Sequence, residues 1–330
     1  MGRIDVLLAI GLMMAGPSMP AGNAQPPSDA TLIPLLDPAI PPTIVRTGPS
    51  LDDRVTIPIH IDGKGPWNFI IDTGSQRTVV ARELALQLAL PPRAMVTILS
   101  MTGKAEANTV AVPRLAFAGG TIDDIEAPVL EGEYLGASGL LGLDSFHAKR
   151  VTLDFRNGRM EISDSSPNRR IKSDPDTIVV EAKRRRGQLI LFDSDVNGMR
   201  VAIMLDTGSH FTIGNMALRD RLIAKNKAPE LLTATLTSVT GGQLTGQVGR
   251  IAAVRMGRVN LRGVPVLFAD ASPFAELGLR DKPALLLGIG ALRTFDRVAI
   301  DFGRGKVDFL LPDASIDSGT RYAATGRPMG

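Results

Sequence analysis

Two aspartates in this chain stand in identical tetrapeptides, each at the end of an apolar run. The first tetrapeptide is Asp72-Thr73-Gly74-Ser75 and the second is Asp206-Thr207-Gly208-Ser209. Two carboxyl groups held within hydrogen-bonding distance share a proton, because they cannot both ionise at low energetic cost. Such a pair provides a base for water and an acid for a carbonyl oxygen at the same pH. The repeated aspartate therefore predicts a site that activates water.

A single Asp-Thr-Gly carries little information, since these are ordinary turn residues. The residues around the two copies, however, correspond in order. Each copy is followed by a helix-like segment, a polar turn with glycine, a segment ending in Pro-Val-Leu, a Leu-Leu-Gly element and a closing strand. These elements lie at residues 81–88, 100–104, 128–130, 140–142 and 151–155, and again at 216–223, 238–242, 265–267, 286–288 and 298–302. This order indicates an internal duplication.

The second half has a longer connection between its Pro-Val-Leu and Leu-Leu-Gly elements. The additional residues surround Ala271-Ser272-Pro273-Phe274. A surface loop is the default expectation for such a connection. A role in shaping one end of a substrate cleft is the alternative.

The order of strand, Asp-Thr-Gly, flap hairpin, Leu-Leu-Gly and closing strand resembles the retroviral-type (retropepsin-like) aspartic peptidases. Here two lobes are fused in one chain, as in bacterial members of that clan. The resemblance covers residues 51–165 and 177–312. It implies a mainly β fold of two homologous acid-protease (closed β) lobes related by a pseudo-twofold axis, with the active site in the cleft between them. The abundance of Val, Ile and Thr at strand positions also favours a mainly β fold.

The resemblance implies roles for the two motifs. Asp72 and Asp206 would form the catalytic dyad. The residues after each aspartate would support it: the threonines by hydrogen bonds across the axis, the glycines by letting the loops fold tightly, and the serines by orienting the carboxylates. In chain order these are Thr73, Gly74, Ser75, Thr207, Gly208 and Ser209.

The polar turns with glycine would form a flap in each lobe. The apolar residue of each turn and the Leu-Leu-Gly elements would line subsites for an extended peptide, whose backbone pairs with the flap strands. Neither flap has a tyrosine, which favours the retroviral-type over the pepsin-like arrangement. The flap residues expected to bind substrate are Met101, Thr102, Gly103, Val239, Thr240 and Gly241.

Composition excludes several other chemistries. The chain has no cysteine, so thiol nucleophiles and thiolate metal sites are excluded. Its three histidines, His60, His147 and His210, are not at metal-ligand spacing, and a Ser-His-Asp hydrolase is hard to assemble from them. We therefore expect no metal and no organic cofactor. His210 directly follows Ser209, so it is a candidate for tuning the second carboxylate, with a partly exposed strand residue as the alternative.

Charge gives no indication of a nucleic-acid partner. The chain has 37 Lys and Arg against 34 Asp and Glu, a net charge of +3. The one basic run, at residues 183–186, is expected to be a solvated loop, with contact to an anionic surface as the alternative.

The N-terminus predicts export. Residues 1–24 form a signal peptide in this interpretation, with an apolar stretch too short to span a membrane and cleavage after Ala24. An anchor that stays attached is the alternative. Residues 25–50 are a proline-rich arm, 166–176 a linker and 313–330 a disordered tail. The arm has one basic residue, Arg46, so it is expected to be a spacer or an edge strand and not a cationic inhibitory segment.

The sequence as a whole predicts a periplasmic or secreted aspartic endopeptidase with a peptide or protein substrate. It would be a monomer, because one chain already contains both half-sites. The dyad would titrate as a coupled pair, with one pKa below and one above that of an isolated aspartate, and its optimum would be acidic to weakly acidic. A non-catalytic periplasmic peptide-binding or regulatory module on the same fold is the main alternative. A processing enzyme with a single target is another.

Overall fold

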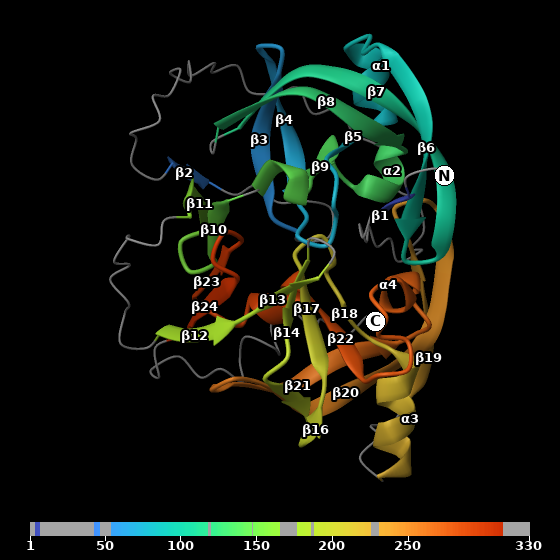
Figure 1. The fold of residues 1–330 in the computed structure, drawn as a ribbon, viewed down its shortest axis with the longest axis vertical. Coiled ribbons are helices and arrows are strands. Elements are labelled where there is room, and N and C mark those ends of the chain that lie inside the picture. Colours follow the sequence, from blue (N-terminus) through green and yellow to red (C-terminus); the bar gives the residue numbers. More distant parts are fainter. Residues whose placement is uncertain are drawn as a thin grey trace, which may run out of the picture.

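The structure is a computed structural model, and it describes residues 4–6, 43–46, 54–117, 120–146, 148–165, 177–185, 188–225 and 231–312. Within these residues strands predominate, joined by turns and short helices (Figure 1). The strands form three sheets, one in each lobe and one between the lobes. The predicted mainly β fold with two homologous lobes is confirmed.

The first lobe is built on an eight-stranded sheet with the order β1-β6-β7-β3-β4-β9-β5-β8. Alternate residues of its strands are fully buried, as in Ile57, Ile59 and Ile61, so one face of the sheet forms the core. The strands are β1 (Ile4–Val6), β3 (Thr56–Ile61), β4 (Lys64–Ile71), β5 (Val79–Ala81), β6 (Pro92–Ser100), β7 (Gly103–Phe117), β8 (Gly120–Leu130) and β9 (Gly139–Leu141). The helices are α1 (Arg82–Gln87), α2 (Gly132–Leu135) and the 3-10 helix η1 (Leu143–Phe146).

The second lobe repeats this plan in a ten-stranded sheet with the order β13-β14-β17-β22-β18-β21-β20-β15-β16, where β19 pairs with β20. Its strands are β13 (Lys183–Arg185), β14 (Gln188–Leu191), β15 (Ser194–Val196), β16 (Met199–Arg200), β17 (Ala202–Asp206), β18 (Thr212–Gly214), β19 (Leu232–Thr237), β20 (Gln243–Met256), β21 (Val259–Phe268) and β22 (Ala284–Gly288). The helices are α3 (Met216–Ala224), α4 (Ser272–Glu276) and α5 (Ile289–Leu292). The helices expected after each motif are therefore present as α1 and α3.

The third sheet joins the lobes. Its order is β12-β24-β23-β10-β11-β2. The two closing strands, β10 and β23, are neighbours and run antiparallel, with Arg150 opposite Asp301, Thr152 opposite Ala299 and Asp154 opposite Arg297. The strand bounds are β2 (Thr43–Arg46), β10 (Lys149–Asp154), β11 (Arg159–Asp164), β12 (Thr177–Glu181), β23 (Arg297–Asp301) and β24 (Lys306–Leu310).

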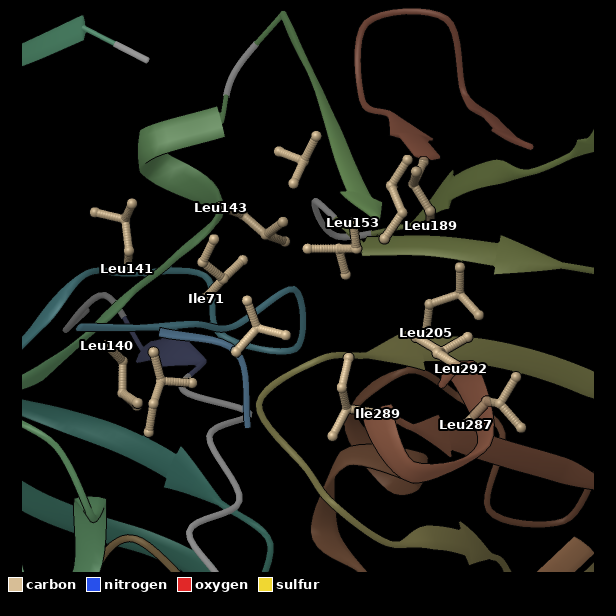
Figure 2. Close-up of a cluster of buried hydrophobic side chains, with 14 of the residues drawn as sticks. Ile71, Leu140, Leu141, Leu143, Leu153, Leu189, Leu205, Leu287, Ile289 and Leu292 are labelled. Atoms are coloured by element: carbon tan, nitrogen blue, oxygen red, sulfur yellow. The ribbon is translucent and has the colours of Figure 1, made fainter. Parts of the chain in front are cut away.

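The hydrophobic core continues from one lobe into the other. Figure 2 shows leucine and isoleucine side chains of both lobes in one cluster. Ile71 and Leu205, which precede the two aspartates, belong to it. The strand ends that carry the motifs are therefore fixed by one shared core.

Several predicted segments lie wholly or mostly outside the described residues. These are the linker at 166–176, the tail at 313–330 and the signal peptide at 1–24, of which only β1 is described, in parallel pairing with β6. Of the proline-rich arm, β2 forms the edge of the sheet between the lobes. In the part of the chain that the structure describes, no helix is both long and apolar enough to cross a membrane.

Candidate active site

Each aspartate lies at the end of a buried strand, and that strand pairs with the Leu-Leu-Gly element of the same lobe. In the first lobe β4 runs parallel to β9, and the Asp72 amide donates to Leu141 O at 3.0 Å. In the second lobe β17 runs parallel to β22, with Asp206 opposite Gly288. The leucines of both elements are buried in the core. In this structure their side chains hold the loops from within, and their lining of substrate subsites stays a prediction.

Main-chain amides of the two loops fix the carboxylates. Asp72 Oδ1 accepts from the amides of Gly74 at 2.8 Å and Ser75 at 2.9 Å. Asp206 Oδ1 accepts from the Gly208 amide at 2.9 Å. The Oδ2 atoms of both aspartates are buried and receive no hydrogen bond from the described residues, while the two carboxyl groups interact with each other. A proton shared between them would satisfy both oxygens.

The threonines lock the two loops together. The Thr73 amide donates to Thr207 Oγ1, and the Thr207 amide donates to Thr73 Oγ1, both at 3.1 Å. Each hydroxyl then donates to a strand-end carbonyl of the opposite lobe, Thr73 to Leu205 O at 2.9 Å and Thr207 to Ile71 O at 2.6 Å. The relative position of the aspartates is therefore set by four reciprocal hydrogen bonds.

The glycines are required because each lies against the aspartate of the other lobe. A Cβ atom on Gly74 would be 2.7 Å from the Asp206 carboxyl, and one on Gly208 would be 2.2 Å from that of Asp72. Carbon atoms do not approach so closely, so any side chain at these positions would displace the dyad. Close approach, and not a left-handed backbone, is the reason for glycine here.

The serines support the dyad in a different way from that predicted. The Ser75 hydroxyl donates to Arg77 O at 2.7 Å, and the Ser209 hydroxyl donates to Phe211 O at 2.9 Å. These bonds close the loop after each aspartate. The carboxylates are instead oriented by backbone amides, including that of Ser75.

The two flap tips meet and close a ring of four hydroxyl groups. Ser100 and Thr102 of the first flap are 3.1 Å apart, Thr102 and Ser238 of the second flap 3.3 Å, Ser238 and Thr240 2.8 Å, and Thr240 and Ser100 3.0 Å. The ring follows the duplication, since Ser100 corresponds to Ser238 and Thr102 to Thr240. The flaps are thus hydrogen-bonded to each other.

The apolar residues of the flap tips are buried in this closed arrangement. Met101 is 1% exposed and packs in the cluster of the second lobe that contains Phe274. The α4 segment supports it, because the Ser272 amide donates to Met101 O at 3.0 Å. Val239 is 0% exposed, and the neighbouring Gly241 lies against the Tyr134 ring of the first lobe. Met101 and Val239 were expected to line open subsites; the structure instead packs them into protein, because each tip reaches across to the other lobe.

The longer connection of the second half is therefore more than a surface loop. Its helix α4 carries Phe274, which is buried, and holds the tip of the first flap. The structure shows that this connection supports the flap, and a role in shaping one end of a substrate cleft stays a prediction.

The dyad has no access to solvent in this structure. Asp72 is 0% and Asp206 1% exposed. Two cavities of ≈ 600 and ≈ 770 Å³ lie on the first lobe, the first beside Trp67 and the second beside Arg77, and neither is lined by the dyad. A peptide therefore reaches the aspartates only after the structure opens around them.

Burial raises the pKa of both carboxyl groups. The pKa of Asp72 rises to about 7, mainly through burial, against the lowering effect of the Gly74 and Ser75 amides and the Arg54 cation. The pKa of Asp206 rises well above its ordinary value, first through burial and then through the negative charge of Asp72. The predicted depression of one pKa is wrong for the closed state, because loss of water outweighs the hydrogen bonds to the anion.

Among the other candidates, the His210 ring packs edge to face against Phe211, with 5.0 Å between ring centroids. The main causes of the shift in the pKa of Asp206 are burial, the Asp72 carboxyl and the amides of its own loop, and His210 is not among them. Within the described ranges there is no group of three or more His, Cys, Asp or Glu residues that fits a metal ion.

Two residues of the site were missed from the sequence, Arg54 and Gln188. Arg54 is 1% exposed and donates to Gly208 O at 3.3 Å and to Leu135 O. Gln188 is buried and donates to Gly74 O at 2.9 Å. Both stand the same number of residues before the aspartate of their own half. An alignment of the two halves that extends back to their first strands places Arg54 and Gln188 at equivalent positions, and this is the signal that could have identified them.

Comparison with known families agrees with this geometry. The fold and the paired loops define a two-lobed, retropepsin-like aspartyl protease. The family model described as aspartyl protease matches residues 57–145 and 192–291, one segment in each lobe, and each segment contains one motif and one flap turn. The chain belongs to this family. No curated protein matches the sequence.

Proposed function

We propose that this protein is an exported aspartic endopeptidase that hydrolyses peptide bonds with water activated by Asp72 and Asp206. The observation that carries the proposal is the pair of interacting carboxyl groups, fixed by backbone amides where the two lobes meet. Export rests on the signal-like sequence of residues 1–24.

The reaction needs one ionised and one protonated carboxyl. The ionised group takes a proton from water as the water oxygen bonds to the scissile carbonyl carbon, and the protonated group gives its proton to the carbonyl oxygen. The resulting diol collapses as the C–N bond breaks. The leaving nitrogen receives the proton that came from water, and the second carboxyl regains a proton from a diol hydroxyl. One water is consumed for each peptide bond, and no bond forms between protein and substrate.

The proposed substrate is an extended segment of a peptide or protein. After the flap tips separate, the segment would lie between them and the dyad and pair its backbone with the flap strands. Reclosure would exclude water and strengthen the electrostatic interactions inside the site. Because both half-sites belong to one chain, the proposed working form is a monomer.

The test is incubation of the purified protein with a diverse peptide library, with and without a transition-state analogue of aspartic peptidases. Cleavage that the analogue abolishes supports the proposal. A matched variant, Asp164→Asn, changes an exposed carboxylate that pairs with Lys149 and should cleave normally. Specific activity should stay constant on dilution of a monomeric protein, and its loss would indicate an obligate dimer.

A peptide-binding or regulatory module is the second candidate. It is favoured by one observation, the burial of the dyad in a structure whose flap tips are hydrogen-bonded to each other. Peptides retained intact by the protein under all tested conditions would support this function and contradict the peptidase.

A further inference from the structure

Arg54 and Gln188 occupy equivalent positions in the two lobes, and their contacts are reciprocal. Arg54 of the first lobe donates to the carbonyl of Gly208 in the second motif. Gln188 of the second lobe donates to the carbonyl of Gly74 in the first motif. Each residue thus reaches across the interface to the motif glycine of the other lobe.

These glycines separate Arg54 and Gln188 from the aspartates. Gly208 lies against the carboxyl of Asp72, and Gly74 lies against the carboxyl of Asp206. Arg54 is therefore separated from the Asp72 carboxyl by Gly208 alone, and Gln188 is separated from the Asp206 carboxyl by Gly74 alone. The geometry is symmetric, but one side carries a positive charge and the other a neutral amide.

We infer that Arg54 is a positioning residue that gives the two aspartates fixed roles, with Asp72 as the base for water and Asp206 as the acid. This inference rests on the proposed peptidase function. A buried cation next to one of two coupled carboxyls stabilises the anion on that side, and the proton then resides on the other. Low polarity around the site increases the effect.

The loop amides act in the same direction as Arg54, so the charge has to be tested separately from them. Asp72 Oδ1 accepts from two amides of its own loop, those of Gly74 and Ser75, whereas Asp206 Oδ1 accepts from one, that of Gly208. Burial acts on both. The Arg54 charge lowers the pKa of Asp72, and the negative charge of Asp72 raises the pKa of Asp206. Among the described residues, Arg54 is the cation whose charge acts on Asp72, and the main causes of the shift in the pKa of Asp206 include no cation.

With these roles each proton transfer of the reaction is assigned to one of the two carboxyls. Asp72 takes the proton that water loses as the C–O bond forms, and Asp206 gives its proton to the carbonyl oxygen. On collapse, Asp72 returns its proton to the leaving nitrogen as the C–N bond breaks, and Asp206 recovers one from the diol. Both carboxyls end each turnover in the state in which they began it.

The family match does not include either residue. The matched segments begin at residues 57 and 192, after Arg54 and Gln188 respectively. The inference therefore rests on the contacts in this chain and not on the family.

The first test titrates each aspartate alone and needs no change at Arg54. With ¹³C-labelled aspartate, the carboxyl signal of Asp72 is followed in Asp206→Asn, and that of Asp206 in Asp72→Asn. Asp72 should titrate about one pH unit or more below Asp206, the usual effect of a neighbouring cation. Equal values, or the opposite order, would overturn the inference.

The second test moves the charge. Arg54→Gln should bring the two titrations together, and the double variant Arg54→Gln with Gln188→Arg should reverse their order. Arg54→Lys keeps the charge and should keep the order. If Arg54→Gln does not fold, Gln188→Arg alone should narrow the difference. A difference unaltered in the folded variants would show that Arg54 has only a structural role.

These titrations separate this inference from the proposed function. The expected order without any peptide cleavage would contradict the peptidase and support the charge asymmetry. Cleavage that is normal, with no difference between the two titrations, would support the peptidase and overturn the fixed roles.

Discussion

Thr102 of the first flap and Ser238 of the second are 3.3 Å apart through their hydroxyl oxygens, and this contact joins two hairpins that belong to different lobes. It is one side of a ring in which every hydrogen bond involves Thr102 or Thr240. Removing these two hydroxyls removes the whole ring without removing any carbon volume.

The double variant Thr102→Val with Thr240→Val should therefore open the flaps more often. Two of these hydrogen bonds cross between the flaps, and each contributes a net ~0.5–1.5 kcal/mol, so opening should become roughly 5- to 150-fold more frequent. Hydrogen exchange of the flap amides, followed by mass spectrometry, measures this directly. Thr235→Val is the matched control, since it removes an exposed hydroxyl that pairs with Thr245 along the same hairpin. Equal exchange in both variants would show that the ring does not hold the tips.

Asp72→Asn and Asp206→Asn should each abolish nearly all peptide cleavage, and the double variant should be little worse. Residues that act as one unit do not have additive effects on rate. Asparagine keeps the oxygen that accepts from the loop amides, so folding should be retained. The measurement is kcat/KM on one cleaved peptide. Near-normal turnover in either single variant would contradict the shared dyad.

The pH profile of cleavage should be a bell whose acidic limb, measured on kcat, lies close to neutral pH. In the closed state burial raises the pKa of Asp72 to about 7, and below that value both carboxyls hold protons and no base remains. The limb measured on kcat/KM should lie at lower pH, because water reaches the dyad when the flaps open. A kcat limb at the value of an isolated aspartate, about 4, would show that the dyad stays hydrated during turnover.

The free energy of unfolding should fall as pH rises from about 4 to about 7. The folded protein holds a proton on Asp72 that the unfolded chain releases, so this group favours the folded state at low pH and loses that contribution as pH passes its folded pKa. The loss for Asp72 is of the order of 4 kcal/mol. Urea unfolding across this range should show a smaller decline for Asp72→Asn than for Asp164→Asn. Identical declines would mean that the dyad is not the source.

The sequence was sufficient to locate the two motifs, the duplication and the helices α1 and α3, because each depends on local order of residues. It did not reveal that Met101 and Val239 are buried, since this depends on flap tips reaching the opposite lobe. The rise in both carboxyl pKa values was missed for the same reason. Arg54 was not recognised because an arginine just before a strand is ordinary until its contact with Gly208 is known.

The pairing of β10 with β23 has a consequence for how the two halves fit together. Arg150 faces Asp301, and Asp154 faces Arg297, while Arg150 and Asp154 are themselves the counterparts of Arg297 and Asp301 in the duplication. Two copies of the first lobe alone would present the same ladder to each other, arginine against aspartate at both ends. The strand pairing between the lobes is therefore self-complementary and would suit two identical subunits as well as two halves of one chain. Within one chain the two halves can differ, as they do at Arg54 and Gln188.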